Sequence, residues 1–271
     1  MTQPPVLRHC TTHAEFDACV RLQRATWGES YRDCVPASVL KVSQRVGGIV
    51  AGAFDARAEM IGFAWGLTGP DAHGRLLHWS HMLAVRADWR DRGVGRALKQ
   101  FQRAALRGTG VATIAWTFDP LVARNAHLNL NLLGVRIAEY VPDMYAETGS
   151  DLHAFGTDRL VAIWPVEPAA SGADSPGERV IPAHFSGAPI VSGTPARHDG
   201  GAPWPGDGRP VRIEVPADIE TIAREQVAVA RAWRDCTRAE FKEGMRRGYV
   251  VTGFARTEEG CFYVLEAGEN G

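Results

Sequence analysis

The chain has 271 residues, of which 45% are hydrophobic and 23% are charged, an ordinary globular composition that excludes a wholly disordered or fibrous protein. Its formal net charge of −1 excludes a global positive field for nucleic acid or an anionic membrane, so an anion site must be local. The five cysteines are widely spaced, which argues against a disulfide framework or a zinc site. With neither a signal peptide nor an apolar run of membrane-spanning length, we expect a soluble cytoplasmic protein.

The first part of the chain predicts a strand, two helices and a hairpin. Thr12 is placed to cap the first helix, whose apolar residues recur at roughly helical spacing. Pro36 suits the first turn of the second helix, and Gly47 suits its end. These patterns predict a strand at 6–10, helices at 12–27 and 36–47, and hairpin arms at 48–54 and 60–67.

The central part of the chain alternates strands with helices. The run 76–85 is the most strand-like, and 93–107 is an amphipathic helix. One face of that helix is predicted to carry Val94, Ala97, Leu98, Phe101 and Ala105. The elements that follow are a strand at 111–118, a helix at 123–133 and strands at 135–140 and 159–166.

The composition changes to Pro, Gly, Ser and Ala after residue 167, as is typical of a linker or a long irregular loop. The similar helix-hairpin patterns of 34–67 and 236–266 favour a partial repeat, although any helix followed by a hairpin gives such a pattern. We predict a first domain at 1–167, a linker at 168–210 and a C-terminal region at 211–271, with a strand at 211–215, a helix at 217–247 and a hairpin at 249–254 and 261–265.

The connection between the strand at 76–85 and the helix at 93–107 carries the strongest functional signal. The first amides of a helix lack internal partners, its dipole adds positive charge, and glycines let a phosphate approach closely. Three arginines add further positive charge. We therefore predict an anion site that contains Arg90, Arg92, Gly93, Val94, Gly95 and Arg96.

Other phosphate-binding loops fit this connection less well. A Walker loop needs a Gly-Lys-Ser/Thr ending, which is absent, and a dinucleotide fingerprint needs a third glycine where Leu98 stands. The remaining alternative is a plain strand-turn-helix connection with solvated arginines.

The loop resembles the pyrophosphate loop of the GNAT superfamily of N-acyltransferases, which reads Gln/Arg-x-x-Gly-x-Gly/Ala after a strand ending apolar-x-Val. The resemblance covers about residues 6–166 and is closest to a bacterial branch of predicted acetyltransferases with a C-terminal extension. It implies an α/β fold, with a central mixed sheet flanked by helices. The matching residues are Leu83 to Val85, Arg90, Gly93, Gly95, Trp116 to Leu121, Arg124 to Ala126, Asn129, Leu133 and Gly134.

The same resemblance implies acetyl-coenzyme A or another acyl-coenzyme A as co-substrate, and no metal. The strand through Val85 would splay from the strand through Phe118, and the pantetheine arm would lie in the gap. The amides of Leu83, Ala84 and Val85 would then polarise the thioester carbonyl.

An acceptor amine must lose a proton before attack, and histidine is tuned for that near neutral pH. Strand alternation places His81 on one face with Leu83, and His78 on the other with Ser80 and Met82, unless a bulge intervenes. The arylalkylamine branch of GNATs also carries a histidine at the position of His81, so we favour His81 as base or water relay. His78 remains an alternative, and either could be a core histidine.

Asp119 and Asn125 follow the strand at 111–118, where acceptor and pantetheine would meet. They could bind the amine or a pantetheine amide, or serve as a turn aspartate and a helix cap. Many GNATs have, where this chain has Leu130, a tyrosine that acts as general acid to the coenzyme A thiolate. Tyr145 or Tyr140 could replace it, or the thiolate could leave unprotonated.

The function expected from these residues is direct acyl transfer to a small amine or an amino acid, with His81, Asp119 and Tyr145 as catalytic candidates. No cysteine lies in the predicted site, which argues against a covalent thiol intermediate. The alternatives are a non-catalytic acyl-coenzyme A-binding module and a protein or peptide N-acetyltransferase. The C-terminal region could line the acceptor pocket, form a homodimer contact or fold as a separate lobe.

Overall fold

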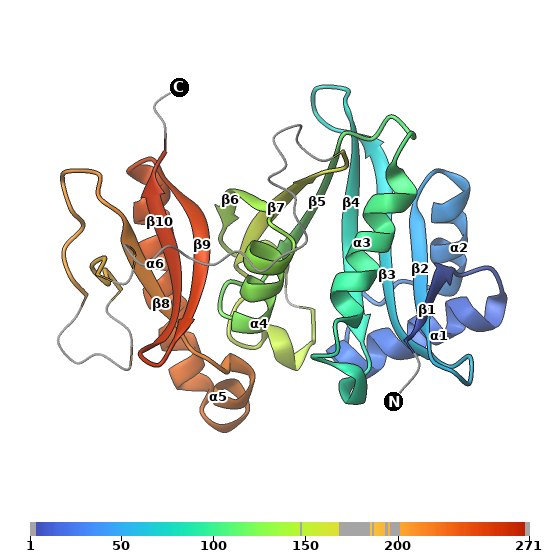
Figure 1. The fold of residues 1–271 in the computed structure, drawn as a ribbon. Helices are drawn as coiled ribbons and strands as arrows, with labels where there is room; N and C mark the ends of the chain where they lie inside the picture. Colours follow the sequence, from blue (N-terminus) through green and yellow to red (C-terminus); the bar gives the residue numbers. More distant parts are fainter. Residues whose placement is uncertain are drawn as a thin grey trace. The chain divides into compact units, whose positions relative to one another are not determined.

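The computed structural model describes residues 4–146, 148–167, 185, 187–192, 195 and 201–268 (Figure 1). The chain divides into two compact units. Unit 1 comprises Met1–Trp116, Thr148–Asp151 and Trp164–Asp174, and unit 2 comprises Thr117–Glu147, Leu152–Ile163 and Ser175–Gly271. This division differs from the predicted boundary after residue 167, because 117–147 and 152–163 pack with the C-terminal region.

The larger sheet contains seven strands in the order β1-β2-β3-β4-β5-β7-β6. It is mixed, as predicted, because β4 and β5 are parallel whereas β1 to β4 pair antiparallel with their neighbours, as do β6 and β7. Its strands and the helices between them are β1 (Val6–His9), α1 (His13–Trp27), α2 (Ala37–Arg45), β2 (Ile49–Phe54), β3 (Met60–Pro70), β4 (Leu76–Val85), α3 (Val94–Leu106), β5 (Thr113–Phe118), α4 (Ala123–Ala126), β6 (Arg136–Val141) and β7 (Arg159–Pro165).

Local sequence explains how α1 and its core form. Thr12 accepts a hydrogen bond from the Glu15 amide, and the Glu15 side chain returns to the Thr12 backbone, a capping box that satisfies exposed amides. The buried face of α1 includes Phe16 and Leu22, which belong to one apolar cluster with Phe63 of β3. Burial of this face stabilises α1 against the sheet.

The C-terminal part of unit 2 forms a three-stranded sheet in the order β8-β10-β9. The described residues 187–192 of the predicted linker lie along β8, where Glu214 donates its amide to Ser192 and Arg212 donates to the Ala188 carbonyl; residues 168–184 lie outside the described part. The elements are β8 (Val211–Val215), α5 (Ile219–Glu225), α6 (Val227–Arg246), β9 (Tyr249–Thr257) and β10 (Gly260–Ala267).

The strands that precede the two segments of the predicted repeat, 34–67 and 236–266, pair differently. The first strand of unit 1, β1, pairs with the first arm of its hairpin, β2, whereas β8 pairs with the second arm, β10. The predicted helix at 217–247 is two helices that meet at Gln226, where the backbone is not helical (φ −145°, ψ 72°). The predicted helix at 123–133 is the short α4 followed by a π-helical turn, His127–Leu132.

Candidate functional site

The connection from β4 to α3 exposes the start of the helix. Gly93 has φ 78° and ψ 0°, a left-handed conformation that favours glycine, and it immediately precedes Val94, the first residue of α3. No side chain caps this helix, and a Cβ on Gly93 would meet nothing within 4 Å. The helix start therefore lacks a side-chain cap, and the space beside Gly93 is open to an anion.

The three predicted arginines surround this turn. Arg90 donates from Nε to the carbonyl of Val85 at 3.3 Å, and the Arg92 guanidinium lies 5.2 Å from the centre of the Trp89 ring. Arg96, in the first turn of α3, has a buried Nε without a hydrogen-bond partner among the described residues. The turn thus combines uncapped amides with positive charge, which is the chemistry of a phosphate site.

Pairing between β4 and β5 stops before β4 ends. Their parallel ladder joins Leu77 to Thr113, and its last pair is Trp79 with Ala115. From Ser80 onward, β4 pairs only with β3 among the described strands. The ladder between the two strands thus ends before their C-terminal ends, as the predicted splay requires.

The free edge of β4 carries two backbone amides. The amide of Arg86 bonds to the carbonyl of Ile61 in β3, and an antiparallel ladder alternates bonded with non-bonded pairs. The amides of Ala84 and Met82 consequently face β3, whereas those of Leu83 and Val85 face the side where β5 has stopped pairing. Of the three residues predicted to polarise a carbonyl, Leu83 and Val85 have amides on the unpaired side of β4, and Ala84 has its amide on the side of β3.

A bulge in β4 changes which side chains share a face. The pair Trp65–Met82 is followed by Leu67–Trp79, so Gly66 lies opposite both Ser80 and His81. Ser80 then contacts α3, while Met82 joins the apolar cluster of α1. The prediction that Ser80 and Met82 share a face is wrong, because it assumed strict alternation along the strand.

The two candidate bases have different surroundings. His81 is exposed, and its ring lies edge-on to Trp65 with centroids 5.3 Å apart. Partial loss of hydration lowers the pKa of His81, and the charge of Asp33 opposes this shift. His78 is buried, shares a 2.9 Å hydrogen bond with Thr68, and has its pKa lowered to about 4 by burial and by Lys99. Of the two, His81 is the histidine that an acceptor can reach.

A buried polar cluster lies where the β4–β5 ladder ends. Lys99 of α3 donates from Nζ to Ser80 Oγ at 2.7 Å, and its Nζ lies 3.9 Å from the centre of the Trp116 ring. Ser80 in turn donates to Gln102 at 2.8 Å. The predicted apolar face of α3 is therefore wrong in part: its buried residues are Val94, Leu98, Lys99, Gln102 and Leu106.

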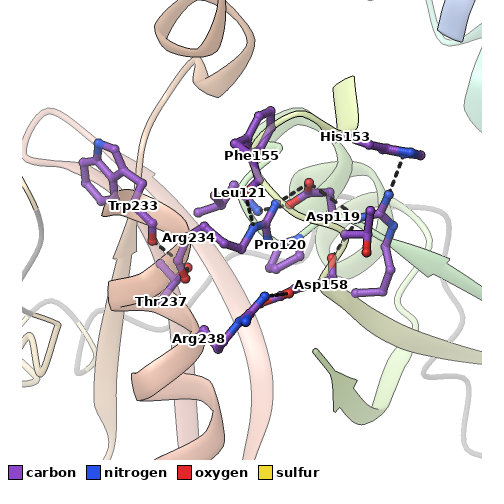
Figure 2. A network of polar contacts seen from close by, with 12 residues as sticks. Asp119, Pro120, Leu121, His153, Phe155, Asp158, Trp233, Arg234, Thr237 and Arg238 are labelled. Carbon is purple, nitrogen blue, oxygen red and sulfur yellow. Dashed lines mark hydrogen bonds and ion pairs between the residues drawn. The ribbon is translucent and has the colours of Figure 1, made fainter. Parts of the chain in front are cut away.

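In unit 2, Asp119 belongs to a network of buried ion pairs (Figure 2). Its carboxylate accepts a 2.6 Å hydrogen bond from Arg234 of α6 and one of 2.8 Å from the Leu121 amide. Arg159 of β7 approaches the same oxygen to 3.6 Å. The buried Asp119 carboxylate therefore lies between two guanidinium groups, those of Arg234 and Arg159.

Tyr145 lies beside the same network. Its hydroxyl shares a 2.8 Å hydrogen bond with Thr117, and the Arg159 guanidinium lies 5.3 Å from the centre of its ring. Tyr140 instead donates to Asp158, and burial raises its pKa. Because the Tyr140 hydroxyl is hydrogen-bonded to the Asp158 carboxylate, Tyr145 is the better placed of the two candidate acids.

Asn125 lies in the middle of the short α4 and does not cap it, because the helix begins after Val122 without a side-chain cap. Its half-buried side chain makes no hydrogen bond within the described residues, so its amide is free to contact a ligand. Sequence reasoning missed Arg159, Arg234 and Lys99. A charged residue on the otherwise buried stripe of an amphipathic helix, as in α3 and α6, is the signal that could have found two of them.

Among the described residues, no group of three or more histidine, cysteine or acidic side chains could hold a metal ion. The same part of the chain contains no helix that is long and apolar enough to cross a membrane.

The chain has the fold of the GNAT N-acetyltransferases. A GNAT superfamily phosphinothricin acetyltransferase from Sinorhizobium meliloti, in complex with acetyl-coenzyme A, is 16% identical, with 65% of this chain and 96% of that chain covered at a TM-score of 0.51. The ribosomal-protein-S18-alanine N-acetyltransferase of Escherichia coli is 19% identical, with coverages of 61% and 96% and a TM-score of 0.45. No protein-family model and no curated protein sequence matches the chain.

Proposed function

We propose that this chain is an acyl-coenzyme A-dependent N-acyltransferase that acts on the amine of a small molecule or an amino acid. The observation that carries the proposal is the free edge of β4, where the amides of Leu83 and Val85 face the gap that opens after Ala115. The uncapped start of α3 follows the C-terminal end of β4 across residues 86–93. One continuous site can therefore hold a pyrophosphate at the helix and a thioester along the strand.

The residues present fit an acyl-coenzyme A. Gly93 leaves room for a phosphate, the buried Nε of Arg96 lacks a partner, and Arg90 and Arg92 supply charge. The bound thioester supplies an activated acyl group. The amides of Leu83 and Val85 would stabilise negative charge that develops on its carbonyl oxygen as the amine attacks.

Proton transfer is assigned to the two best-placed candidates. His81 is exposed on β4 and its lowered pKa keeps it neutral near pH 7, so it can accept a proton from the acceptor directly or through water. Tyr145 would return a proton to the departing thiolate. Asp119 would act through Arg159, whose guanidinium it holds beside Tyr145.

Calorimetric titration of the protein with acetyl-coenzyme A tests the binding site. Gly93→Ala keeps the open space and adds only left-handed strain, about 1–2 kcal/mol. Gly93→Glu adds the same strain and also a carboxylate, which at roughly 6 Å from a phosphate charge costs about 3 kcal/mol at an effective dielectric constant near 20.

Gly93→Glu should therefore bind about a hundredfold more weakly than Gly93→Ala. Equal affinities for the two folded variants would contradict phosphate binding at this turn. Release of free thiol with a panel of amines then distinguishes an enzyme from a module that only binds acyl-coenzyme A.

A further inference from the structure

Helix α6 contributes two arginines, one turn apart, that contact unit 2 carboxylates in different ways (Figure 2). Arg238 uses both Nε and Nη2 on Asp158, and Nη2 also donates to Asp143 at 2.7 Å. This fork-to-fork geometry is the arrangement expected of a structural ion pair. Arg238 is partly exposed, and the pairing keeps the pKa of Asp158 low although burial opposes it.

Arg234 is buried more deeply and is less completely satisfied. Its side chain is 2% exposed, one nitrogen donates to Asp119 at 2.6 Å, and Nε reaches the Phe155 carbonyl at 3.4 Å. Its Nη1 is buried without a hydrogen-bond partner in the described residues. An arginine kept for stability alone would be expected to satisfy its buried donors, because each unmade hydrogen bond is a loss.

Asp119 links Arg234 to Arg159, because both guanidinium groups approach its carboxylate. Arg234 lies at hydrogen-bond distance from Asp119 Oδ2, whereas Arg159 stays at 3.6 Å from the same atom. Arg159 is thereby left to donate to the His153 ring at 2.8 Å and to lie over the ring of Tyr145. The His153 ring stacks on the Tyr145 ring, with centroids 6.4 Å apart. Arg159 and its partner His153 therefore both lie against Tyr145.

We propose that Arg234 is a positioning residue, through which the C-terminal helix α6 holds Arg159 and Tyr145 in the arrangement that acyl transfer requires. This inference rests on the proposed function, in which Tyr145 returns the proton to the thiolate. It also assigns a role to the C-terminal region, which supplies one member of the Asp119–Arg159–Tyr145 chain of contacts.

Removing Arg234 should move Arg159. With Arg234 absent, the Asp119 charge would be balanced by Arg159 alone, and Coulomb attraction would draw the Arg159 guanidinium from 3.6 Å to hydrogen-bond distance. That movement would change the contacts of the guanidinium with His153 and the Tyr145 ring. The Tyr145 ring would then no longer be held by its present contacts with Arg159 and His153, and its hydroxyl would be less well positioned.

A double-mutant cycle on the full-length chain tests the proposal. The variants are Arg234→Met, Tyr145→Phe and their combination, with thiol release from acetyl-coenzyme A as the assay. Arg234→Met should lower kcat about tenfold and leave KM for acetyl-coenzyme A unchanged. In the Tyr145→Phe background the same substitution should change kcat less than about twofold, because the residue through which it acts is already gone.

Two further variants separate positioning from folding. Arg238→Met removes an ion pair from the same helix, so it should lower the thermal unfolding midpoint while kcat stays within about twofold of the wild type. Arg234→Lys keeps the charge near Asp119 and should restore part of kcat, and it replaces Arg234→Met if that variant does not fold.

The outcomes distinguish the inference from the function on which it rests. A wild-type protein that releases no thiol with any amine would remove the proposed function. A wild type that turns over, with equal fold losses from Arg234→Met in both backgrounds, would overturn the positioning role and leave Arg234 as a purely structural residue.

Discussion

Replacing Lys99 by methionine should remove a pH dependence of stability that the buried amine creates. Lys99 is 3% exposed, and its Nζ bonds to Ser80 and lies over the Trp116 ring. Within the described residues no carboxylate forms an ion pair with Lys99, and burial is the cause of its pKa shift. Burial therefore holds the pKa of Lys99 well below the ordinary value of about 10.4 that the unfolded chain keeps.

The sign of the effect follows from the proton balance. Between the folded and unfolded pKa values the unfolded chain binds one proton more than the folded chain, so the free energy of unfolding rises with pH. The slope is about 1.4 kcal/mol of unfolding free energy per pH unit wherever the pH lies between the folded and the unfolded pKa, and this rise with pH is the gain that Lys99 creates. Lys99→Met should lack this gain and should be the more stable protein at the lower pH.

Urea unfolding at several pH values measures the difference between wild type and Lys99→Met. Lys242→Met is the matched control, because Lys242 is exposed on α6. The difference between wild type and Lys99→Met should shrink as pH rises, while the Lys242→Met curve should follow the wild type. Parallel curves for wild type and Lys99→Met would show that folded Lys99 keeps its proton and would refute the reasoning.

Two further predictions concern the same part of unit 1. Gly66→Ala would place a Cβ 2.3 Å from His78 Nε2 and 2.6 Å from the Trp79 carbonyl, so urea unfolding should show a loss of about 2 kcal/mol or more, whereas Gly69→Ala, with nothing within 4 Å, should not. Because the pKa of His78 falls to about 4, lowering the pH from about 6.5 should cost about 1.4 kcal/mol per pH unit. In His78→Gln the free energy of unfolding should fall less steeply as the pH is lowered below about 6.5. An unchanged slope would count against a neutral buried His78.

Periodicity and turn residues were enough to predict the order of strands and helices in unit 1. The strand at 76–85 and the cap at Thr12 are confirmed, because both depend on interactions within a few residues. The bulge opposite Gly66 was not predictable, because a shift of register depends on two strands whose pairing the sequence does not specify.

The candidate site divides in the same way. The turn at Gly93 follows from local chemistry, and the structure places it at the start of α3 as expected. Asp119 was singled out as a residue, but its partner Arg234 lies 115 positions further along the chain. Contacts of that separation arise from tertiary packing, so no local pattern could identify Arg234 as the neighbour of Asp119.

The burial of Lys99 also decides how the protein can be labelled. The sequence contains three lysines, and of these Lys41 on α2 and Lys242 on α6 are exposed. Unit 1 and unit 2 therefore each present one reactive side-chain amine, while the third is shielded beneath Ser80 and Trp116. Lysine-directed reagents should accordingly place one probe on each unit, and a Lys41→Arg or Lys242→Arg substitution restricts the probe to the other.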